Sequence, residues 1–265
     1  MHQPPTNSKI ALSLIVPAYN ESDRIREPLG RMIAYLAAQS YTSEIIVVDD
    51  GSDDDTAAIA RRQAAGAPVP VEVVRYPTNG GKGLALKVGF SRARGARILF
   101  TDADLSVPIE LAERLIAALD GGADVAIGTR NHPESVLPTR QPWLRQTLGA
   151  AFTLLVRILI SRVSDATCGF KAFRGDVGRD LFARLRNHGW SFDAEILFLA
   201  HRSGYQTREL PISWSDRPGT NVRIGRDAIG SLLGLARIRW NAARGLCDRP
   251  CDVELPLEIW REEEE

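Results

Sequence analysis

Short apolar runs rich in valine and isoleucine alternate along this chain with segments whose apolar residues recur every three or four positions. The short runs predict buried strands, and the periodic segments predict amphipathic helices. Strands are expected at residues 12–16, 45–48, 71–75, 98–101 and 125–128. Helices are expected at residues 84–94 and 109–119, and on the apolar series Ile25, Leu29, Ile33 and Leu36. This alternation predicts an α/β fold with a mainly parallel, Rossmann-like central sheet covered by helices on both faces.

Beyond the fifth run the pattern changes. A polar, proline-containing stretch at residues 131–140 predicts a mobile loop beside the strand ends. Helical patterns follow at residues 144–163, 192–203 and 226–244, with a strand at 207–214. We expect an N-terminal extension at 1–9, a main domain at 10–220, an amphipathic basic helix at 221–247 and a frayed acidic tail at 248–265.

Polar and aromatic residues collect where the expected strands end. Residues 17–21, Pro-Ala-Tyr-Asn-Glu, follow the first strand, and residues 49–52, Asp-Asp-Gly-Ser, follow the second. Ser22 and Asp53 are expected to cap the helices that come next. In open α/β sheets ligands bind at the carboxyl ends of the strands, so these segments are candidates for a binding site.

Two aspartates, Asp102 and Asp104, stand one residue apart after the fourth strand. Strand geometry sends alternate side chains to the same side, so the two carboxylates can converge. Converging carboxylates repel, and a divalent cation that also holds phosphate oxygens removes that cost. A solvated aspartate-rich turn is the alternative interpretation of the same triplet.

Residues 76–83, Tyr-Pro-Thr-Asn-Gly-Gly-Lys-Gly, contain a glycine turn and a lysine before a helix. Gly83 replaces the Ser or Thr of a Walker loop, and Leu86 holds the last glycine place of a dinucleotide fingerprint. The remaining features suit an anion, because exposed amides and a helix N-terminus both attract negative charge. A plain turn that starts the next helix remains the alternative.

Charge and composition narrow the classes of protein. With 33 basic and 33 acidic residues the net charge is zero, so no global field favours nucleic acid. The three cysteines, an odd number without a signal peptide, indicate a reducing cytoplasm, and Cys247 and Cys251 lack the spacing of a zinc site. The longest apolar stretch, 144–163, is interrupted by three arginines, so no spanning helix is expected.

Six segments appear together in a fixed order: 17–21, 47–52, 79–83, 101–106, Gly-Thr-Arg at 128–130 and Cys-Gly-Phe-Lys-Ala-Phe-Arg at 168–174. Over about residues 10–220 the chain thereby resembles the inverting GT-A glycosyltransferases of the dolichyl-phosphate sugar synthase group. Within that group it looks most like the dolichyl-phosphate β-glucosyltransferases. The resemblance implies a GT-A fold and a sugar-transfer activity.

The resemblance also assigns roles to residues of this chain. It places the sugar nucleotide on Pro17, Ala18, Tyr19, Glu21, Asp50, Lys82, Asp102 and Ala103. It implies a Mg²⁺ or Mn²⁺ ion on Asp104 and Asp102. Members that transfer mannose often carry Gln where this chain has Ser106, which leaves the third metal contact open and favours a UDP-sugar. For Glu21 and Asp50, helix capping is the alternative role, and the two roles are compatible.

Further residues are assigned to the transferred phosphates. Arg130 is expected on the diphosphate or the acceptor phosphate, and Lys171 and Arg174 on a lipid phosphate. Asp193, near the start of a helix, is a candidate general base, but an ionised phosphate acceptor hardly needs one, and helix capping is the alternative. Two lone histidines, His132 and His188, are expected at the surface.

The activity implied is transfer of a sugar, foremost glucose from UDP-glucose, onto a polyprenyl or dolichyl phosphate. One alternative is a soluble transferase with a saccharide, metabolite or protein acceptor, and the other is a catalytically silent sugar-nucleotide binder. The arginine-flanked apolar faces of 144–163 and of the last helix favour peripheral contact with the cytoplasmic face of a membrane, unless both faces cover the protein's own core.

Overall fold

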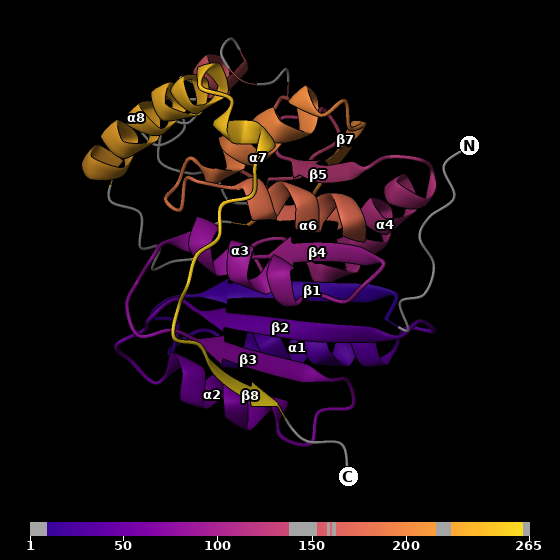
Figure 1. The fold of residues 1–265 in the computed structure, drawn as a ribbon. Helices are drawn as coiled ribbons and strands as arrows, with labels where there is room; N and C mark the ends of the chain where they lie inside the picture. The colour runs from indigo at the N-terminus through magenta and orange to yellow at the C-terminus, as the bar shows by residue number, and fades with distance from the viewer. Residues whose placement is uncertain (1–9, 138–152, 158–159, 161–162, 216–223, 262–265) are drawn as a thin grey trace.

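The computed structural model describes residues 10–137, 153–157, 160, 163–215 and 224–261. Within them a single eight-stranded sheet runs in the order β7-β5-β6-β4-β1-β2-β3-β8 (Figure 1). The first five strands are β1 (Leu12–Ala18), β2 (Ser43–Asp49), β3 (Val71–Arg75), β4 (Arg97–Thr101) and β5 (Val125–Thr129). The other three are β6 (Phe170–Arg174), β7 (Thr207–Pro211) and β8 (Glu258–Arg261).

The parallel centre of the sheet confirms the α/β prediction. β1 pairs in parallel with β2 and β4, β2 with β3, and β5 with β7. β6 runs antiparallel between β4 and β5, and β8 runs antiparallel beside β3. The expected strand at 207–214 ends at Pro211, and the other expected strands differ from the observed ones by at most two residues at either end.

Two layers of helices cover the sheet, as the apolar patterns predict. α1 (Arg26–Ala37), α2 (Thr56–Ala64) and α4 (Ala112–Asp120), preceded by the short η1 (Ile109–Leu111), share a core with one face of the sheet. On the other face lie α3 (Lys82–Arg92), α6 (Gly175–Arg184), α7 (Phe192–Arg202) and α8 (Ile224–Ala243). Alternate strand residues pack into the two cores: Ile15 and Ile46 into that of α3, and Leu14 and Ile45 into that of α1.

Neither β6 nor α6, which follow each other along the chain, was predicted from the sequence. β6 contains Lys171 and ends in Arg174, so it lacks the continuous apolar run that marks the other strands. Phe170 and Phe173 nevertheless lie in opposite cores, and Lys171 is only 1% exposed. α6 begins at the residue after β6, with no loop between them. The N–H of its first residue, Gly175, donates to the carbonyl of Ala96 at 2.7 Å.

The prediction of a frayed acidic tail is wrong for residues 258–261. These residues form β8, whose Trp260 is opposite Val73 of β3. Arg261 forms an ion pair with Glu72, and Glu258 lies 3.6 Å from Arg61. The charge balance of the segment suggested a solvated end, but its isolated Ile-Trp pair is enough to complete the sheet edge. Figure 1 shows the irregular segment before β8, residues 249–257, crossing the molecule.

The predicted helix caps are also wrong. α1 begins at Arg26 and α2 at Thr56, several residues after Ser22 and Asp53. The N–H of Ser22 instead donates to Asp54 Oδ2 at 3.1 Å, and that of Asp53 to Asn20 Oδ1 at 2.9 Å. These polar groups therefore tie the turn after β1 to the turn after β2.

The predictions for 131–140 and 144–163 fall partly outside the described residues. Val136 forms a bridge with Ser213, so the described part of the first segment is anchored beside β7. In the second, residues 153–157 are helical, as expected. Among the described residues, no helix has the length and apolar character needed to cross a bilayer.

Candidate active site

The carboxyl ends of β1, β2, β4 and β5 meet at one edge of the sheet and carry the candidate residues. Pro17 and Ala18 are buried at the end of β1, and Tyr19 is half-buried just beyond it. Glu21 binds Arg24 through two hydrogen bonds of 2.7 and 2.8 Å. Burial raises the pKa of Glu21, which Arg24 opposes and the charges of Asp104 and Asp102 reinforce, so these carboxylates belong to one neighbourhood.

Asp50 organises the glycine turn that precedes α3. Its two carboxylate oxygens accept hydrogen bonds from Tyr76 Oη at 2.6 Å, Asn79 Nδ2 at 2.9 Å, and the N–H groups of Gly80 and Gly81 at 2.7 and 2.9 Å. Burial raises the pKa of Asp50, although these donors oppose the shift. The structure thus gives Asp50 a loop-holding role, and its predicted contact with the nucleoside remains a prediction.

The other side of the glycine turn rests on residues 187–189. The N–H of Gly83 donates to the carbonyl of His188 at 2.8 Å, and a Cβ on Gly81 would lie 2.6 Å from the same oxygen. Gly81 also has a φ of +93°, which a glycine adopts readily. His188 is only half-exposed and its Nε2 is buried, so a simple surface position is wrong for it.

The Asp-Ala-Asp turn brings two carboxylates to the same edge. Asp104 Oδ1 accepts two hydrogen bonds of 2.9 Å from Ser106, one from its N–H and one from its hydroxyl. Both bonds fall on Oδ1, so Oδ2 can serve a ligand. Ala103 is buried beneath the turn, and Asp102 forms an ion pair with Lys82. The sequence left open whether Ser106 supplies a third metal contact. In the structure its described bonds orient Asp104.

The chemistry of this turn fits Mg²⁺ or Mn²⁺. Among the described residues no group of three or more acidic, cysteine or histidine side chains converges to hold a metal. Mg²⁺ in sites that bind phosphates takes one or two carboxylates together with phosphate oxygens of the substrate, and carboxylates of this turn are ligands of that kind. Asp104 and Asp102 are the residues that would hold it.

Gly169 fixes the position of Asp102 from the opposite side. A Cβ at residue 169 would lie 2.0 Å from Asp102 Oδ2, so the carboxylate packs directly against the glycine. The backbone of the Cys-Gly-Phe-Lys segment therefore forms the wall of the Asp-Ala-Asp turn. The two motifs are therefore in direct steric contact in this fold.

We expect Gly169→Ala to displace Asp102 and weaken binding of Mn²⁺–UDP about 10- to 100-fold with little change in melting temperature. Gly189→Ala is the matched control, because nothing lies within 4 Å of the Cβ it would add. Calorimetric titration of both variants checks the expectation. Equal affinity of the two variants would show that the wall is not needed.

Arg130 is held by a partner that the sequence analysis missed, Asp165. Its Nε and Nη2 donate to the two oxygens of Asp165 at 2.7 and 2.8 Å, and Nη2 also donates to Thr167 Oγ1 at 2.8 Å. The guanidinium lies 5.6 Å from the ring centroid of Trp214. Burial would raise the pKa of Asp165, but Arg130 outweighs it and holds that pKa below its ordinary value. A lone aspartate four residues before Gly169 was the only sequence signal.

Lys171 and Asp193 form a buried pair. Lys171 Nζ donates to Asp193 Oδ1 and to the carbonyl of Cys168, each at 2.5 Å. Burial raises the pKa of Asp193, and the charges of Lys171 and Lys82 oppose the shift. Because Lys171 is 1% exposed, its described contacts position Asp193 and the Cys168 backbone rather than present a free ammonium. Its predicted contact with a lipid phosphate remains a prediction.

Arg174 lies away from the other candidates. In the antiparallel register of β6, Phe170 is opposite Thr101 at the site edge, whereas Arg174 is opposite Arg97 at the other end of β4. Its guanidinium binds Asp124 at 2.5 Å and Asp176 at 2.7 Å. We therefore leave Arg174 out of the site. It stands in the Cys-Gly-Phe-Lys-Ala-Phe-Arg motif because β6 runs from the site edge of the sheet to the opposite edge.

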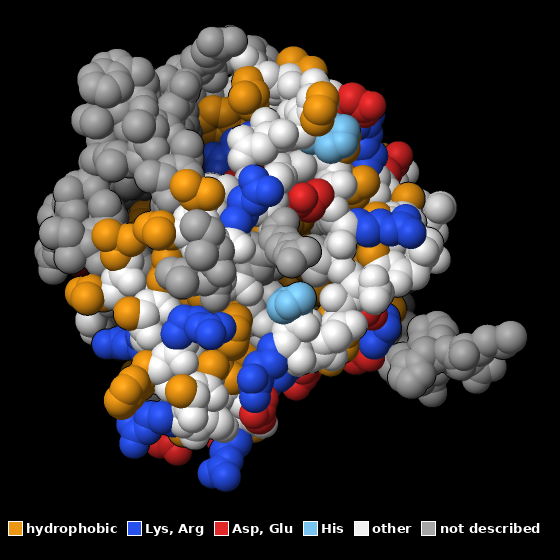
Figure 2. All heavy atoms as spheres, turned by 90° about the horizontal axis from the view of Figure 1, so that it is seen from above, with side chains coloured by type: hydrophobic (Ala, Val, Ile, Leu, Met, Phe, Trp, Pro, Cys, Tyr) orange, Lys and Arg blue, Asp and Glu red, His pale blue; other side chains and the backbone are white. Residues whose placement is uncertain are grey.

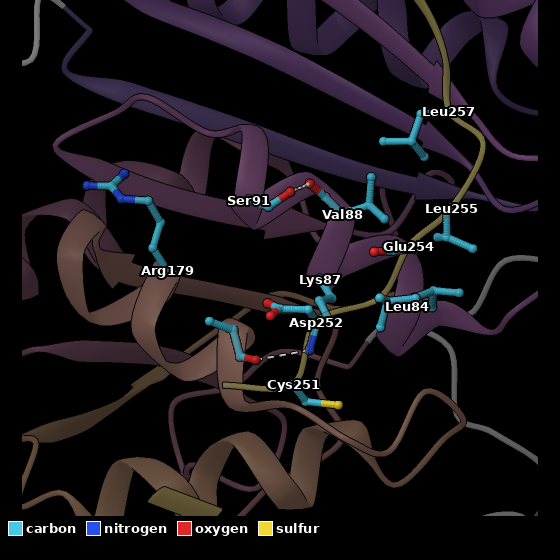
Figure 3. Close-up of a pocket in the computed structure, with 12 residues that line it drawn as sticks. Leu84, Lys87, Val88, Ser91, Arg179, Cys251, Asp252, Glu254, Leu255 and Leu257 are labelled. Atoms are coloured by element: carbon cyan, nitrogen blue, oxygen red, sulfur yellow. Dashed lines mark hydrogen bonds between the residues drawn. The ribbon is translucent and has the colours of Figure 1, made fainter. Parts of the chain in front are cut away.

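A separate hollow of 430 Å³ lies along α3 and away from these residues. The strap at 251–257 forms one wall, and Leu84 and Val88 of α3 form another (Figure 3). Lys87, nine-tenths buried there, donates to the carbonyls of Ala183 and Leu185 at 3.0 and 2.9 Å. Of the described residues lining it, none belongs to the predicted site, so the hollow does not replace that site.

Comparisons with known proteins agree with this geometry. The sequence model of Glycosyl transferase family 2 matches residues 13–182. The dolichyl-phosphate beta-glucosyltransferase of Saccharomyces cerevisiae is 34% identical over 254 residues, which cover 88% of this chain and 75% of the yeast protein. The human enzyme of the same name is 31% identical over 225 residues, covering 80% and 69%.

Solved structures show the same fold. Mannosyl-3-phosphoglycerate synthase from Rubrobacter xylanophilus superposes with a TM-score of 0.66 and 18% identity, over 97% of this chain and 87% of that one. Glucosyl-3-phosphoglycerate synthase from Mycobacterium tuberculosis, solved with Mn²⁺, UDP-glucose and phosphoglyceric acid, gives a TM-score of 0.62 and 18% identity, over 89% and 85%. At such identities these structures show the fold alone.

The fold is thus the GT-A fold, and the chain belongs to glycosyl transferase family 2. It is a glycosyltransferase, and its resemblance to the dolichyl-phosphate β-glucosyltransferases is confirmed by several such relatives at 31–34% identity over most of the chain.

Proposed function

We propose that this enzyme transfers glucose from UDP-glucose to dolichyl or another polyprenyl phosphate, with inversion and with help from Mg²⁺ or Mn²⁺. The observation that carries the proposal is the convergence of Asp102, Asp104, Lys82 and Arg130 at one sheet edge. The names of the relatives supply the acceptor and the sugar, since enzymes 31–34% identical act on dolichyl phosphate. The UDP complexes of fold neighbours support the nucleotide.

The chain's own residues account for donor binding. The turn at 17–21 and the glycine turn held by Asp50 form the two sides of the nucleoside position. Lys82, at the N-terminal end of α3, faces the diphosphate, because an ammonium and the positive end of a helix dipole both favour an anion. A cation held by Asp102 and Asp104 would supply positive charge against the diphosphate as it leaves.

The transfer itself is a direct displacement. An oxygen of the acceptor phosphate attacks the anomeric carbon while the bond from that carbon to the diphosphate oxygen breaks, and the bonding pair leaves with the diphosphate. The acceptor phosphate is largely ionised at neutral pH, so it needs no proton removed. Asp193, already bound to Lys171, then serves to orient the acceptor side. Arg130, rigidly held by Asp165, faces phosphate charge.

A panel of labelled sugar nucleotides tests the proposal. The purified protein is incubated with UDP-glucose, UDP-N-acetylglucosamine or GDP-mannose, and with dolichyl phosphate, dolichol or 3-phosphoglycerate. We expect label in the organic phase only for dolichyl phosphate, most with UDP-glucose. Transfer to 3-phosphoglycerate, or to dolichol as well as to its phosphate, would overturn the assigned acceptor.

Peripheral membrane contact belongs to the same proposal. On α8, Leu235 and Ile238 face the core, whereas Leu233 and Trp240 are 67% and 64% exposed. Figure 2, looking onto the end of the molecule with α7, β7 and α8, shows apolar and basic side chains side by side. Such a mixture suits the interface of a bilayer with anionic headgroups.

We expect the protein to float with anionic liposomes at low salt, and less at high salt, because arginines on α8 contribute to binding. Leu233→Glu with Trp240→Glu is expected to lower the bound fraction about tenfold, since two apolar side chains are lost from the interface. Arg31→Glu on α1 serves as the control for added negative charge. Native protein that stays unbound at low salt would favour a water-soluble acceptor.

A further inference from the structure

Lys82 is placed where a cation and a diphosphate would both act on it. It is the first residue of α3 and directly follows the Gly80 and Gly81 amides that Asp50 holds. Its Nζ forms an ion pair with Asp102 Oδ1. The two side chains are 22% and 39% exposed, so solutes reach the pair. The Asp102 carboxylate therefore binds Lys82 and is also a ligand of the proposed cation.

Two aromatic rings hold the ammonium independently of Asp102. Lys82 Nζ lies 5.9 Å from the ring centroid of Phe100 and 5.8 Å from that of Phe192. Contacts of this kind attract a cation without neutralising it. The two rings therefore favour the ammonium near the site edge even when it no longer binds Asp102.

Three carboxylates surround this lysine. Burial alone would lower the pKa of Lys82, but Asp102, Asp193 and Asp104 outweigh burial and raise it above the ordinary value. Asp193 is in turn paired with Lys171. Asp102 is the only one of the three with a direct ion pair to Lys82 among the described residues. It is therefore the carboxylate whose charge Lys82 neutralises most.

We propose that Lys82 and a divalent cation compete for Asp102, and that a nucleoside diphosphate decides the competition by drawing the ammonium to itself. This inference rests on the proposed function, because it assumes that the diphosphate and the cation meet at this edge. Lys82 would then make cation binding depend on the nucleotide, so that the two enter the site together.

The coupling follows from charge alone. An ammonium bound to Asp102 repels a divalent cation a few ångströms away. It also occupies Asp102 Oδ1, an oxygen that the cation would use as a ligand. A diphosphate offers the ammonium more negative charge than one carboxylate does. Removal of the ammonium frees Asp102 and takes away a repelling charge, so it should strengthen cation binding to the protein alone. It should weaken nucleotide binding without the cation, because the diphosphate loses a positive partner.

Mn²⁺ binding measured by electron paramagnetic resonance tests this without any turnover. For Lys82→Met we expect Mn²⁺ to bind the protein alone about tenfold more tightly than it binds the native chain. In chelator, we expect UDP to bind the same variant about tenfold more weakly by calorimetry. Lys82→Gln should behave like Lys82→Met, and circular dichroism checks that both variants fold.

Two controls separate a local exchange from a general loss of charge. Lys82→Arg keeps the charge and should bind Mn²⁺ like the native protein, and Arg202→Met, at the far end of α7, should also match it. Unchanged or weaker Mn²⁺ binding by Lys82→Met, or equal strengthening by Arg202→Met, would overturn the exchange. If native protein binds no UDP even with Mn²⁺, the proposed function itself fails.

Discussion

Asp104→Ala is expected to lower sugar transfer about 1,000-fold or more while the melting temperature stays near that of the native protein. In the proposed function, Asp104 supplies a carboxylate oxygen to the cation that meets the charge of the leaving diphosphate. Its described hydrogen bonds are to Ser106 within the same turn, so its removal costs the fold little. Steady-state kinetics and thermal melts on the same preparation give both numbers.

Asp120→Ala is the matched comparison, because this aspartate is exposed and bound to Arg97 at the opposite end of the sheet. It should keep transfer within about twofold of native. Native-like activity of Asp104→Ala, or full activity of the native enzyme in excess chelator, would contradict the assignment of Asp104 to a cation.

Arg130→Ala is expected to lower kcat about 100- to 1,000-fold, because a rigidly held guanidinium stabilises developing phosphate charge better than water does. The substitution also leaves Asp165 buried without its ion-pair partner, so some loss of stability accompanies it. Asp165→Asn separates the two effects. It keeps the side-chain shape and one acceptor oxygen but removes the charge and the second acceptor, so the Arg130 guanidinium is held less rigidly. We expect kcat to fall roughly tenfold.

Arg174→Ala is the comparison for Arg130→Ala, because the sequence motifs placed both arginines in the site. This arginine follows the same Cys-Gly-Phe-Lys segment, but its partners are Asp124 and Asp176 at the far edge of the sheet. It should affect stability and leave kcat within about twofold of native. A loss of kcat equal to that of Arg130→Ala would return Arg174 to the acceptor side.

The fold was largely predictable because the buried parallel strands are continuous apolar runs. Val71–Arg75 appears as predicted, and the covering helices follow the expected periodicity. β6 escaped prediction because its five residues include a buried lysine and a terminal arginine. β8 escaped it because four residues inside an acidic segment give little hydrophobic signal. Both are recognisable only once their neighbours in the sheet are known.

The site was predictable to the extent that its residues follow strand ends. Asp102, Asp104, Lys82 and Arg130 come together as the α/β topology requires. The partners that fix them are distant in sequence: Asp165 for Arg130, Gly169 for Asp102 and Asp193 for Lys171. A motif records which residues recur, whereas only the register of β6 against β4 shows that Arg174 lies at the wrong end of its strand.

The structure of the lipid product tests direct displacement by a lipid phosphate most directly. The native enzyme is incubated with UDP-glucose labelled with ¹³C at C1, dolichyl phosphate and Mg²⁺, and the organic extract is analysed by nuclear magnetic resonance. We expect a glucosyl phosphate lipid whose labelled anomeric carbon is β-linked. An α-linked product, or label found only as free glucose in the aqueous phase, would contradict direct displacement by a lipid phosphate.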